Sequence, residues 1–435
     1  MRWPFFYGWL VVGVAFVTMG IGVNARTAFS LLFPPILAEF GWERGLTAGA
    51  FSVGFLVTAL VSPLIGTLTD RWGPRGLLLV GVLCVGAGMG LAPLIREPWH
   101  LYLTLGVLVS GGTLAVGYTG HALFLPNWFV RRRGFAIGVA FSGVGIGSIV
   151  LLPWLQALIQ RAGWRHACVA MAVLVVVVLG PLSLLQRRRP EDMGLSADGR
   201  ASPPGAARDA HPSDVVDPAW AAVDWTVARA MRTARFWWIA LGFVAALFSW
   251  YAVQVHQTKY LMEIGFAPAQ AAYALGLVGF VGIFGQIGLG HLSDRIGREW
   301  VWTLGNAGFV ICCALLLVMR DHPAPVFLYA MVVSQGLLGY GLASIYGAIP
   351  AEIFQGRRYA TIFGTLSAAS TAGAGLGPWV AGVVHDRTGS YVVAFAIAIG
   401  CSAVSALAIW LAAPGKVRAV AGRIPAARPL RRSRE

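Results

Sequence analysis

The chain has 435 residues, of which 57% are hydrophobic and 12% are charged, and its mean hydropathy is +0.71. Soluble globular domains carry about 25% charged residues, so this composition excludes that class and indicates a membrane protein. The formal net charge of +15 could suggest nucleic acid, but the basic residues are spread over connections between apolar stretches. That distribution favours anionic lipid headgroups of the bilayer as their partner, and no nucleic acid.

Twelve apolar stretches are each long enough to cross about 30 Å of hydrocarbon as a helix, since a helix rises about 1.5 Å per residue. The strands of a membrane β-barrel are about half as long. The predicted fold class is therefore an all-α membrane protein with twelve transmembrane helices. In chain order, the predicted spans are 8–33, 45–69, 76–95, 100–127, 134–160, 166–186, 236–262, 268–292, 300–319, 324–351, 359–384 and 390–413.

The predicted spans form an N-terminal half, 1–186, and a C-terminal half, 236–413, joined by a polar linker, 187–235, and followed by a basic tail, 414–435. Within the linker, "RASPPGAARDAHPSD" (200–214) has the composition of a disordered segment. Asp217 and Pro218 then predict the N-cap and first position of one short amphipathic helix on the membrane surface. The residues that recur at helical spacing in this stretch are Trp220, Val223, Val227 and Met231.

The basic residues predict the orientation of the chain. Of the 33, 25 lie at the termini and in the connections that follow even-numbered spans, and two, Arg26 and Lys259, lie inside predicted helices. By the positive-inside rule, both termini are expected in the cytoplasm of a multi-pass cell-membrane protein. The opposite face holds six basic residues: Arg44, Arg96, Arg161, Arg165, Arg320 and Arg387.

An internal repeat relates the two halves. "GTLTDRWGPR" at 66–75 reappears as "GHLSDRIGRE" at 290–299, an offset of 224 residues, and "PW" at 153–154 recurs at 378–379, an offset of 225. "RRRG" at 131–134 likewise has "GRRY" at 356–359 as its counterpart. The matching register predicts that the halves are structural copies, as in membrane proteins built from parallel repeats.

The repeated motif has residues suited to contacts at helix ends. Gly66 permits close helix contact, and Asp70 can accept hydrogen bonds at the N-terminus of the next helix. Arg71 and Arg75 can meet the exposed carbonyls of helix C-termini, where the helix dipole favours cations. Such contacts can be made and broken between two packings of the bundle, or they can simply anchor the loop.

This motif resembles the loop between helices 2 and 3 of the major facilitator superfamily, which reads Gly-x-Leu-x-Asp-Arg-x-Gly-x-Arg. Gly66, Leu68, Asp70, Arg71, Gly73 and Arg75 match it, and the second copy matches at Gly290, Leu292, Asp294, Arg295 and Gly297, with Arg298 one position before the place of the last arginine. The resemblance implies a gating role for Gly66, Asp70, Arg71, Arg75, Gly290, Asp294, Arg295 and Arg298.

Three further segments resemble monocarboxylate transporters and their oxalate/formate antiporter relatives: "FFYGWLVV" (5–12), "NWFVRRRGFAIGVAFSGVGIGS" (127–148) and "RRRPEDMGL" (187–195). Gly134, Gly138 and Ser142 recur every four residues, a spacing that also serves close helix packing. The resemblance implies a secondary transporter that moves a small organic anion by alternating access, with a coupling proton as a further candidate partner.

Arg26 is the most informative candidate, because a charge within the bilayer costs several kcal/mol or more unless it faces water or a partner. Counted from Gly8, it lies about 27 Å along its helix. The 18 acidic residues all fall in loops or near helix ends. We expect Arg26 to face a water-filled central cavity and to bind the substrate carboxylate in a two-pronged manner. Snorkelling outward or bonding to backbone carbonyls are the alternatives.

The other predicted substrate-binding residues are Asn24, Tyr118, His121, His256, Gln257, Lys259, Gln286, Tyr340 and Tyr346. The resemblance places helices 1, 4, 7 and 10 along the pathway. Histidine is more often a packing residue than a proton carrier in such helices, and Lys259 could equally snorkel or attract anions. On the eighth helix, Gly282 and Gln286 stand where the relatives place an aspartate and an arginine. The absence of the aspartate and the arginine argues against proton-coupled lactate transport and favours another organic anion or a different coupling.

Two other functions compete with this hypothesis. One is export of drugs or other metabolites on the same fold, and the other is a membrane sensor that signals through its linker without transport. The sequence contains no nucleophile constellation, phosphate-binding glycine loop or metal-ligand cluster, so we predict neither an enzyme nor a bound cofactor or metal.

Overall fold

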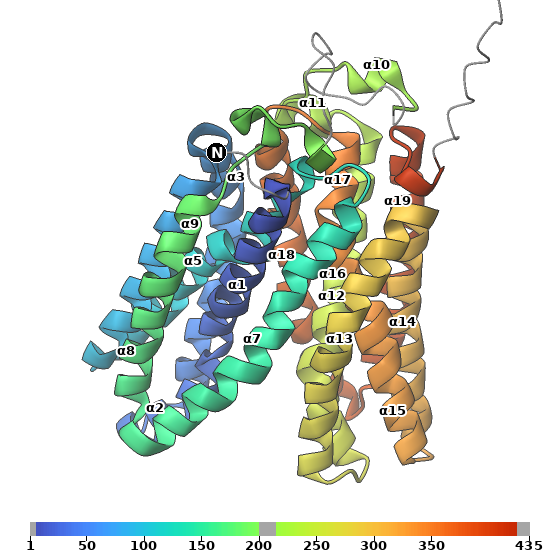
Figure 1. Ribbon diagram of the computed structural model, residues 1–435. Helices are drawn as coiled ribbons and strands as arrows, with labels where there is room; N and C mark the ends of the chain where they lie inside the picture. The colour runs from blue at the N-terminus through green and yellow to red at the C-terminus, as the bar shows by residue number, and fades with distance from the viewer. Residues whose placement is uncertain (1–5, 200–214, 424–435) are drawn as a thin grey trace, which may run out of the picture.

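The computed structural model describes residues 6–199 and 215–423, and every predicted span is mostly helical in it (Figure 1). Residues 1–5, the predicted linker segment 200–214 and residues 424–435 of the predicted tail lie outside the described residues. Ten described stretches are apolar and long enough to cross a membrane. One of them, Val53–Leu94, contains parts of two predicted spans, and the 30-residue helix α18 is not among the ten.

The N-terminal half is built from long helices that are interrupted at defined points. In α3, two helices meet at Gly73, whose φ of +72° is left-handed and therefore suits glycine. The helices are α1 (Tyr7–Thr27), α2 (Phe29–Phe40), α3 (Arg44–Leu91), α4 (Pro98–Leu101), a π-helix (Tyr102–Val109), α5 (Ser110–Val116), α6 (Tyr118–Ala122), α7 (Arg133–Ala162), α8 (Trp164–Leu174), a second π-helix (Val175–Leu179) and α9 (Gly180–Leu185).

The C-terminal half repeats this plan, including a π-helix in its fourth span. Its helices are α12 (Ala234–Glu263), α13 (Pro268–Ile296), α14 (Arg298–Met319), α15 (Pro325–Val333), the π-helix Ser334–Gly339, α16 (Gly341–Tyr346), α17 (Ala348–Ile353), α18 (Tyr359–Thr388) and α19 (Val392–Ala412).

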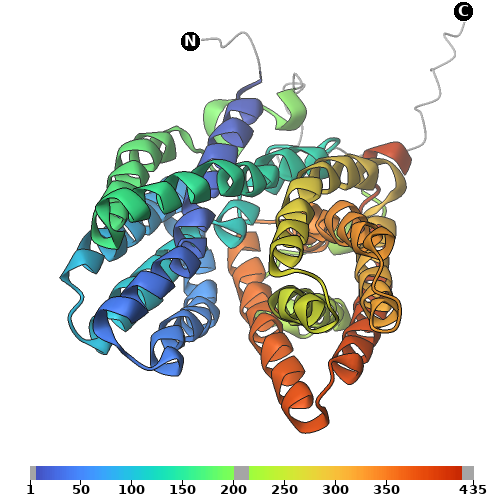
Figure 2. The ribbon, with the colours of Figure 1, turned by 90° about the horizontal axis from the view of Figure 1, so that it is seen from below.

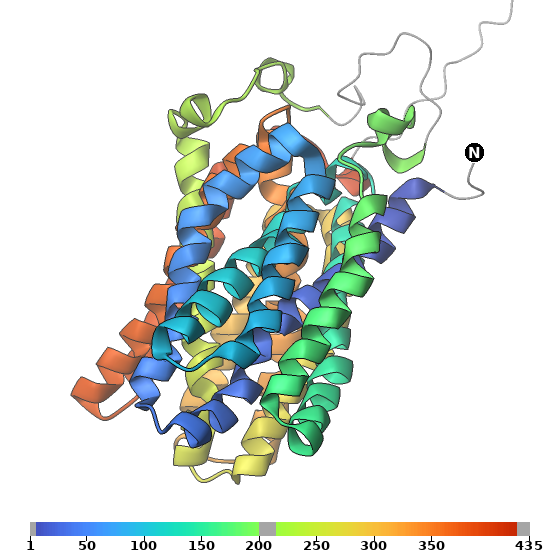
Figure 3. The ribbon, with the colours of Figure 1, turned by 90° about the vertical axis from the view of Figure 1, so that its left-hand side faces the viewer.

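The linker crosses one end of the bundle, which we call the linker end (Figure 1, top). The start of α1 and the last turn of α19 lie at the same end, and Figure 3 shows the linker helices over it from the side of the N-terminal half. Seen from the opposite, far end, the helices form two groups, blue to green and yellow to red (Figure 2). In Figure 1 the ribbons of the two groups diverge towards the far end.

The single helix predicted after Asp217 is wrong in its extent. Asp217 does cap a helix, since its side chain accepts a hydrogen bond from the backbone N of Trp220 at 3.0 Å, but α10 ends at Ala221 (Pro218–Ala221). Thr226 then caps a second short helix, α11 (Val227–Met231). Trp225 lies between them and packs on Trp220 with ring centroids 4.6 Å apart, so the chain turns instead of continuing helically.

The two halves meet along two helix pairs, α7 on α13 and α3 on α18, which together we call the seam. Both pairs depend on glycine. A Cβ atom on Gly138 would lie 2.3 Å from the carbonyl oxygen of Gln286, and one on Gly66 would lie 2.3 Å from that of Ala360. The close approach predicted for the glycine spacing in 134–142 and for Gly66 is therefore present, and it lies between the halves.

Candidate functional site

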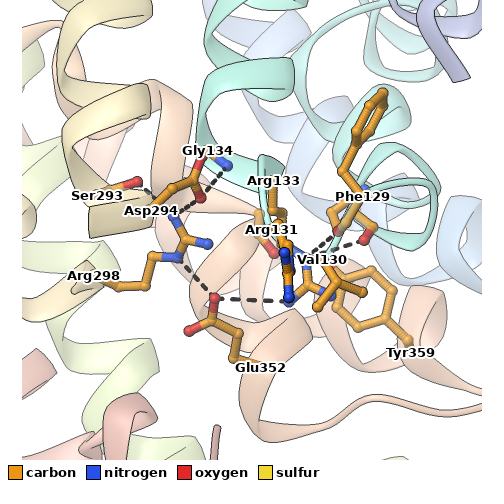
Figure 4. A network of polar contacts seen from close by, with 12 residues as sticks. Phe129, Val130, Arg131, Arg133, Gly134, Ser293, Asp294, Arg298, Glu352 and Tyr359 are labelled. Atoms are coloured by element: carbon orange, nitrogen blue, oxygen red, sulfur yellow. Dashed lines mark hydrogen bonds and ion pairs between the residues drawn. The ribbon is translucent and has the colours of Figure 1, made fainter. Parts of the chain in front are cut away.

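At the linker end, Asp294 of α13 binds the first turn of α7 across the seam (Figure 4). Its Oδ1 accepts a hydrogen bond from the backbone N of Gly134, and its Oδ2 accepts one from that of Phe135, both at 2.9 Å. The first turn of a helix has unpaired N–H groups and a partial positive charge, so a carboxylate is a favourable partner there.

Three further charges complete what we call the Asp294 cluster: Arg133, Arg298 and Glu352 (Figure 4). Arg298 bonds to Asp294 at 2.8 Å and to Glu352 at 2.7 Å, and Arg133 lies 3.7 Å from the same Glu352 oxygen. None of the four side chains is more than 6% exposed. Buried charges persist only when they are paired, so these two cations and two anions depend on one another.

Asp70 of α3 makes the corresponding contact on the other side of the seam. Its Oδ2 accepts hydrogen bonds from the backbone N of Thr361 at 2.9 Å and from the Thr361 hydroxyl at 2.6 Å, at the start of α18. The Asp70 carboxylate thus meets a helix N-terminus as predicted, but that helix belongs to the other half. Arg188 of the linker pairs with Asp70 Oδ1 at 2.9 Å and donates to the carbonyl of Arg357 at 2.7 Å. We call Asp70, Arg188 and Thr361 the Asp70 cluster.

The other motif arginines differ in their contacts. Arg75 donates to the carbonyl of Gln186 at 3.0 Å, just after α9 ends, as predicted for a cation at a helix C-terminus. Arg71 and Arg295 are exposed. Arg188 meets the Asp70 carbonyl at 2.8 Å, a role the sequence suggested for the motif arginines. Burial lowers the pKa of the Arg188 guanidinium, and the Asp70 carboxylate opposes that shift.

Sequence reasoning did not assign Arg133, Arg188, Glu352 or Thr361 to these clusters. Glu352 carried a signal, because it is an acid within the apolar run "AIPAEIF". Arg133 lies in the repeated basic motif, which marked the segment without showing which of its three arginines turns inward.

A second group of side chains lies towards the middle of the bundle, around Arg26. The Arg26 guanidinium carbon is 4.2 Å from the centroid of the Phe55 ring, a cation–π contact between α1 and α3. Phe55 in turn meets Tyr251 of α12 edge to face, with ring centroids 5.8 Å apart. Arg26 is half-buried and lies next to an aromatic contact that joins the two halves.

Uncharged polar groups lie near Tyr251, the α12 residue that Phe55 contacts. Gln254 donates to the Tyr340 hydroxyl at 3.5 Å, and the Tyr340 ring lies 4.7 Å from that of Trp250. A Cβ on Gly282 would lie 2.8 Å from Tyr340, so the glycine leaves room for this ring. Gln286 is buried and lies near Tyr118.

The remaining predicted residues lie outside this group or have packing contacts. The Asn24 amide bonds to the carbonyls of Gly20 and Val144 between α1 and α7. His256 contacts the Tyr391 hydroxyl and the Pro378 carbonyl, and Tyr346 contacts Ser367 and Ser370. Lys259 lies 3.8 Å from Glu263 with 65% of its side chain exposed, while Gln257 and His121 are buried.

Two pseudo-symmetric helical halves, joined at one end of the seam by carboxylate-to-helix contacts, are the construction of a secondary transporter. The chain belongs to the Major Facilitator Superfamily, whose family model matches residues 9–298 and 263–434. It is a multi-pass membrane transporter and not an enzyme.

The curated relatives include several monocarboxylate transporters. Monocarboxylate transporter 13 of Bos taurus is 25% identical over 398 residues, which cover 90% of this chain and 86% of the relative. Monocarboxylate transporter 3 of Rattus norvegicus is 28% identical over 403 residues, covering 90% of this chain and 77% of the relative. The kinship to monocarboxylate transporters is distant but extends over nearly the whole chain.

Solved structures share the fold. The major facilitator transporter FucP in its outward conformation aligns with a TM-score of 0.66 and 18% identity, covering 93% of this chain and 98% of FucP. The human organic anion transporter MFSD10 aligns with a TM-score of 0.67 and 17% identity, covering 94% of this chain and all of MFSD10.

Proposed function

We propose that this transporter moves a small organic anion of the monocarboxylate kind across the cell membrane by alternating access. The observation that carries the proposal is the position of Arg26, a permanent cation that lies over Phe55 next to the Phe55–Tyr251 contact between the halves. A guanidinium presents paired N–H groups in one plane, which fit the two oxygens of a carboxylate.

The surroundings of Arg26 favour an anion over a cation. The polar side chains next to the Phe55–Tyr251 contact, Gln254, Gln286, Tyr118 and Tyr340, are amides and phenols, which donate hydrogen bonds without adding charge. The positive charge of Arg26 repels a cationic substrate, which argues against an exporter of apolar cations. An anion with a small polar or aromatic body would pair with the charge of Arg26 and also contact the aromatic and amide side chains nearby.

The two clusters would supply the gate at the linker end. In each, a carboxylate closes the seam by accepting hydrogen bonds from the first turn of a helix, and such bonds can be replaced by water when the halves separate. We place the linker end in the cytoplasm, because the basic residues concentrate there. With the clusters formed, the linker end would be closed and the substrate would reach Arg26 from the far end. The distant kinship to monocarboxylate transporters supports the same substrate class.

Uptake into proteoliposomes tests this function. Radiolabelled acetate, lactate, pyruvate and benzoate would be compared in vesicles with and without the protein. For the substrate that is taken up, Arg26→Gln should raise the half-saturating concentration roughly tenfold to a hundredfold, since a hydrogen bond to a charged group contributes about 1.5–3 kcal/mol. Arg161→Gln, which removes an exposed cation at the end of α7, is the matched control and should transport normally.

Two results would overturn the proposal. One is uptake of none of the four anions above the level of empty vesicles. The other is an Arg26→Gln protein that matches Arg161→Gln in both rate and half-saturating concentration.

A further inference from the structure

His121 lies on α6, directly after a break in the fourth predicted span. The break is at Gly117, which has an extended backbone with φ −102° and ψ −156°. The Gly117 carbonyl accepts a hydrogen bond from the backbone N of His121 at 3.2 Å, and ring Nδ1 of His121 lies 2.9 Å from the same oxygen. Because a carbonyl only accepts, Nδ1 carries a hydrogen, and in the neutral ring Nε2 is the acceptor.

The Nε2 atom of His121 is buried with its acceptor position open. The side chain is 0% exposed, and among residues 6–199 and 215–423 this nitrogen has no hydrogen-bond partner. Leaving a buried polar atom unsatisfied costs about 1–3 kcal/mol. The ring is further enclosed by Phe124, whose ring centroid is 5.5 Å away.

The C-terminal half closes over this part of α6. The Tyr359 hydroxyl of α18 lies 3.1 Å from the carbonyl oxygen of Ala122, the residue after His121, and 2.8 Å from that of Gly347. A Cβ on Gly347 would lie 2.8 Å from the Ala122 side chain. Separation of the halves at the linker end would therefore remove the cover next to His121.

The titratable groups on the elements around α6 have contacts of their own. Tyr118 of α6 lies near Gln286, and the Tyr359 hydroxyl of α18 donates to two carbonyls. Arg133 of α7 and Glu352 of α17 pair with each other. Asp70 of α3 binds Thr361, and Arg26 of α1 lies over Phe55. None of these contacts reaches the His121 ring. Water is then the natural source of a proton for Nε2, once it can enter.

The internal repeat shows that this position is unusual. The offset of 225 residues places Tyr346 of the C-terminal half opposite His121. The Tyr346 hydroxyl lies 2.6 Å from Ser370 Oγ and 3.3 Å from Ser367 Oγ, so its polar atom is satisfied. The second half thus holds a bonded phenol where the first half holds an imidazole, the side chain whose charge changes most readily near neutral pH.

We propose that His121 is a proton-binding site, that Nε2 takes the proton, and that protonation favours the conformation in which the halves separate at the linker end. The inference rests on the alternating access of the proposed function. A buried imidazolium without an anion is unfavourable, so the conformation that hydrates the ring binds more protons. Lower pH therefore populates that conformation, by at most about tenfold per pH unit for one proton.

The test measures conformation and needs no substrate. Spin labels would be attached at Arg131→Cys and Arg358→Cys, two exposed positions on opposite sides of the seam, after replacement of the five native cysteines. Their distance distribution would be recorded by pulsed electron spin resonance between about pH 8 and about pH 5. Acid pH should increase the long-distance population in the otherwise unchanged protein.

Two histidine variants identify the group responsible. His121→Gln keeps an amide that can donate to the Gly117 carbonyl but takes no proton, so its distances should not change with pH. His166→Gln is the matched control, because His166 also places Nδ1 at 2.8 Å from the carbonyl four residues earlier but is exposed. It should keep the full pH response.

A pH response that persists in His121→Gln overturns the proposal, and so does the absence of any response in the parent protein, which needs no variant to fold. Failure here is distinguishable from failure of the proposed function, because no organic anion is present. Anion uptake with pH-independent distances would refute only the His121 site, whereas a His121-dependent response without uptake would refute only the anion substrate.

Discussion

The Asp294 cluster and the Asp70 cluster occupy equivalent places in the two halves but are built differently. Asp294 has two buried arginines and a buried glutamate around it, with no side chain more than 6% exposed. Asp70 has one arginine, and the Arg188 side chain is 25% exposed. The same contact between a carboxylate and a helix N-terminus is therefore almost fully buried at Asp294 and partly open to water at Asp70.

The two clusters differ because the two copies of the repeat differ in sequence at two positions. In the N-terminal half, Pro74 and Asn127 stand at the positions equivalent to Arg298 and Glu352. Without those charges, the first copy cannot build a four-membered network, and its cation comes from the linker, as Arg188. The comparison teaches that two copies of a repeated contact can differ in their source of charge while they keep the hydrogen bonds to the helix backbone.

The largest expected effect is on the buried cluster. Arg298→Met leaves two buried carboxylates, Asp294 and Glu352, with only the more distant Arg133 near them. Removing one partner of a buried ion pair costs about 3–5 kcal/mol, so the free energy of unfolding should fall by that order. Thermal unfolding followed by fluorescence-detected gel filtration would show a marked decrease in melting temperature. An unchanged melting temperature would mean that these charges are hydrated in the membrane-embedded protein.

A smaller and symmetrical effect is expected at the glycines of the seam. Gly138→Ala and Gly66→Ala would each bring a methyl group to 2.3 Å from a carbonyl oxygen of the facing helix. Forcing extra volume into a packed contact costs about 1–3 kcal/mol, and both variants should separate the halves to a similar extent. The spin-label distance between positions 131 and 358 measures this. Gly180→Ala is the control, since nothing lies within 4 Å of its added Cβ; a wild-type distance in only one seam variant would contradict the symmetry.

The smallest effect is expected at Arg188. An ion pair that is partly open to water contributes about 0–1 kcal/mol and is screened by salt. Arg188→Gln should therefore lower the melting temperature only slightly at low ionic strength and not measurably at about 1 M salt, where the Debye length is about 3 Å. Arg187→Gln, one residue earlier, controls for net charge. An effect as large as that of Arg298→Met would show that Arg188 acts as a buried charge.

The sequence predicted the helices, the repeat and the two motif carboxylates, because each rests on a local pattern: apolar length, register and helix-end chemistry. It did not predict the partners of these carboxylates, since Asp70 meets Thr361 and Asp294 meets Gly134 across distances in sequence that no local pattern spans. The linker helix was predicted too long for a related reason, because Trp225 packs back on Trp220 and overrides the helical spacing. The role of Arg26 and the other substrate-binding residues stays a prediction.

The linker is attached at both of its described ends. Before residue 200, Arg188 and Arg189 already donate to the carbonyls of Arg357 and Gly356 on the C-terminal half. After residue 214, the backbone N of Val216 donates to the carbonyl of Val417 at 2.9 Å, and the Trp220 indole donates to that of Ile353 at 2.8 Å. A cut of the peptide chain between 200 and 214 would leave the Arg188 and Arg189 bonds as contacts between the two fragments, whereas the Val216 and Trp220 bonds lie within the second fragment. We therefore expect the seam and these two bonds to hold together two separately synthesised polypeptides that end and begin in this segment.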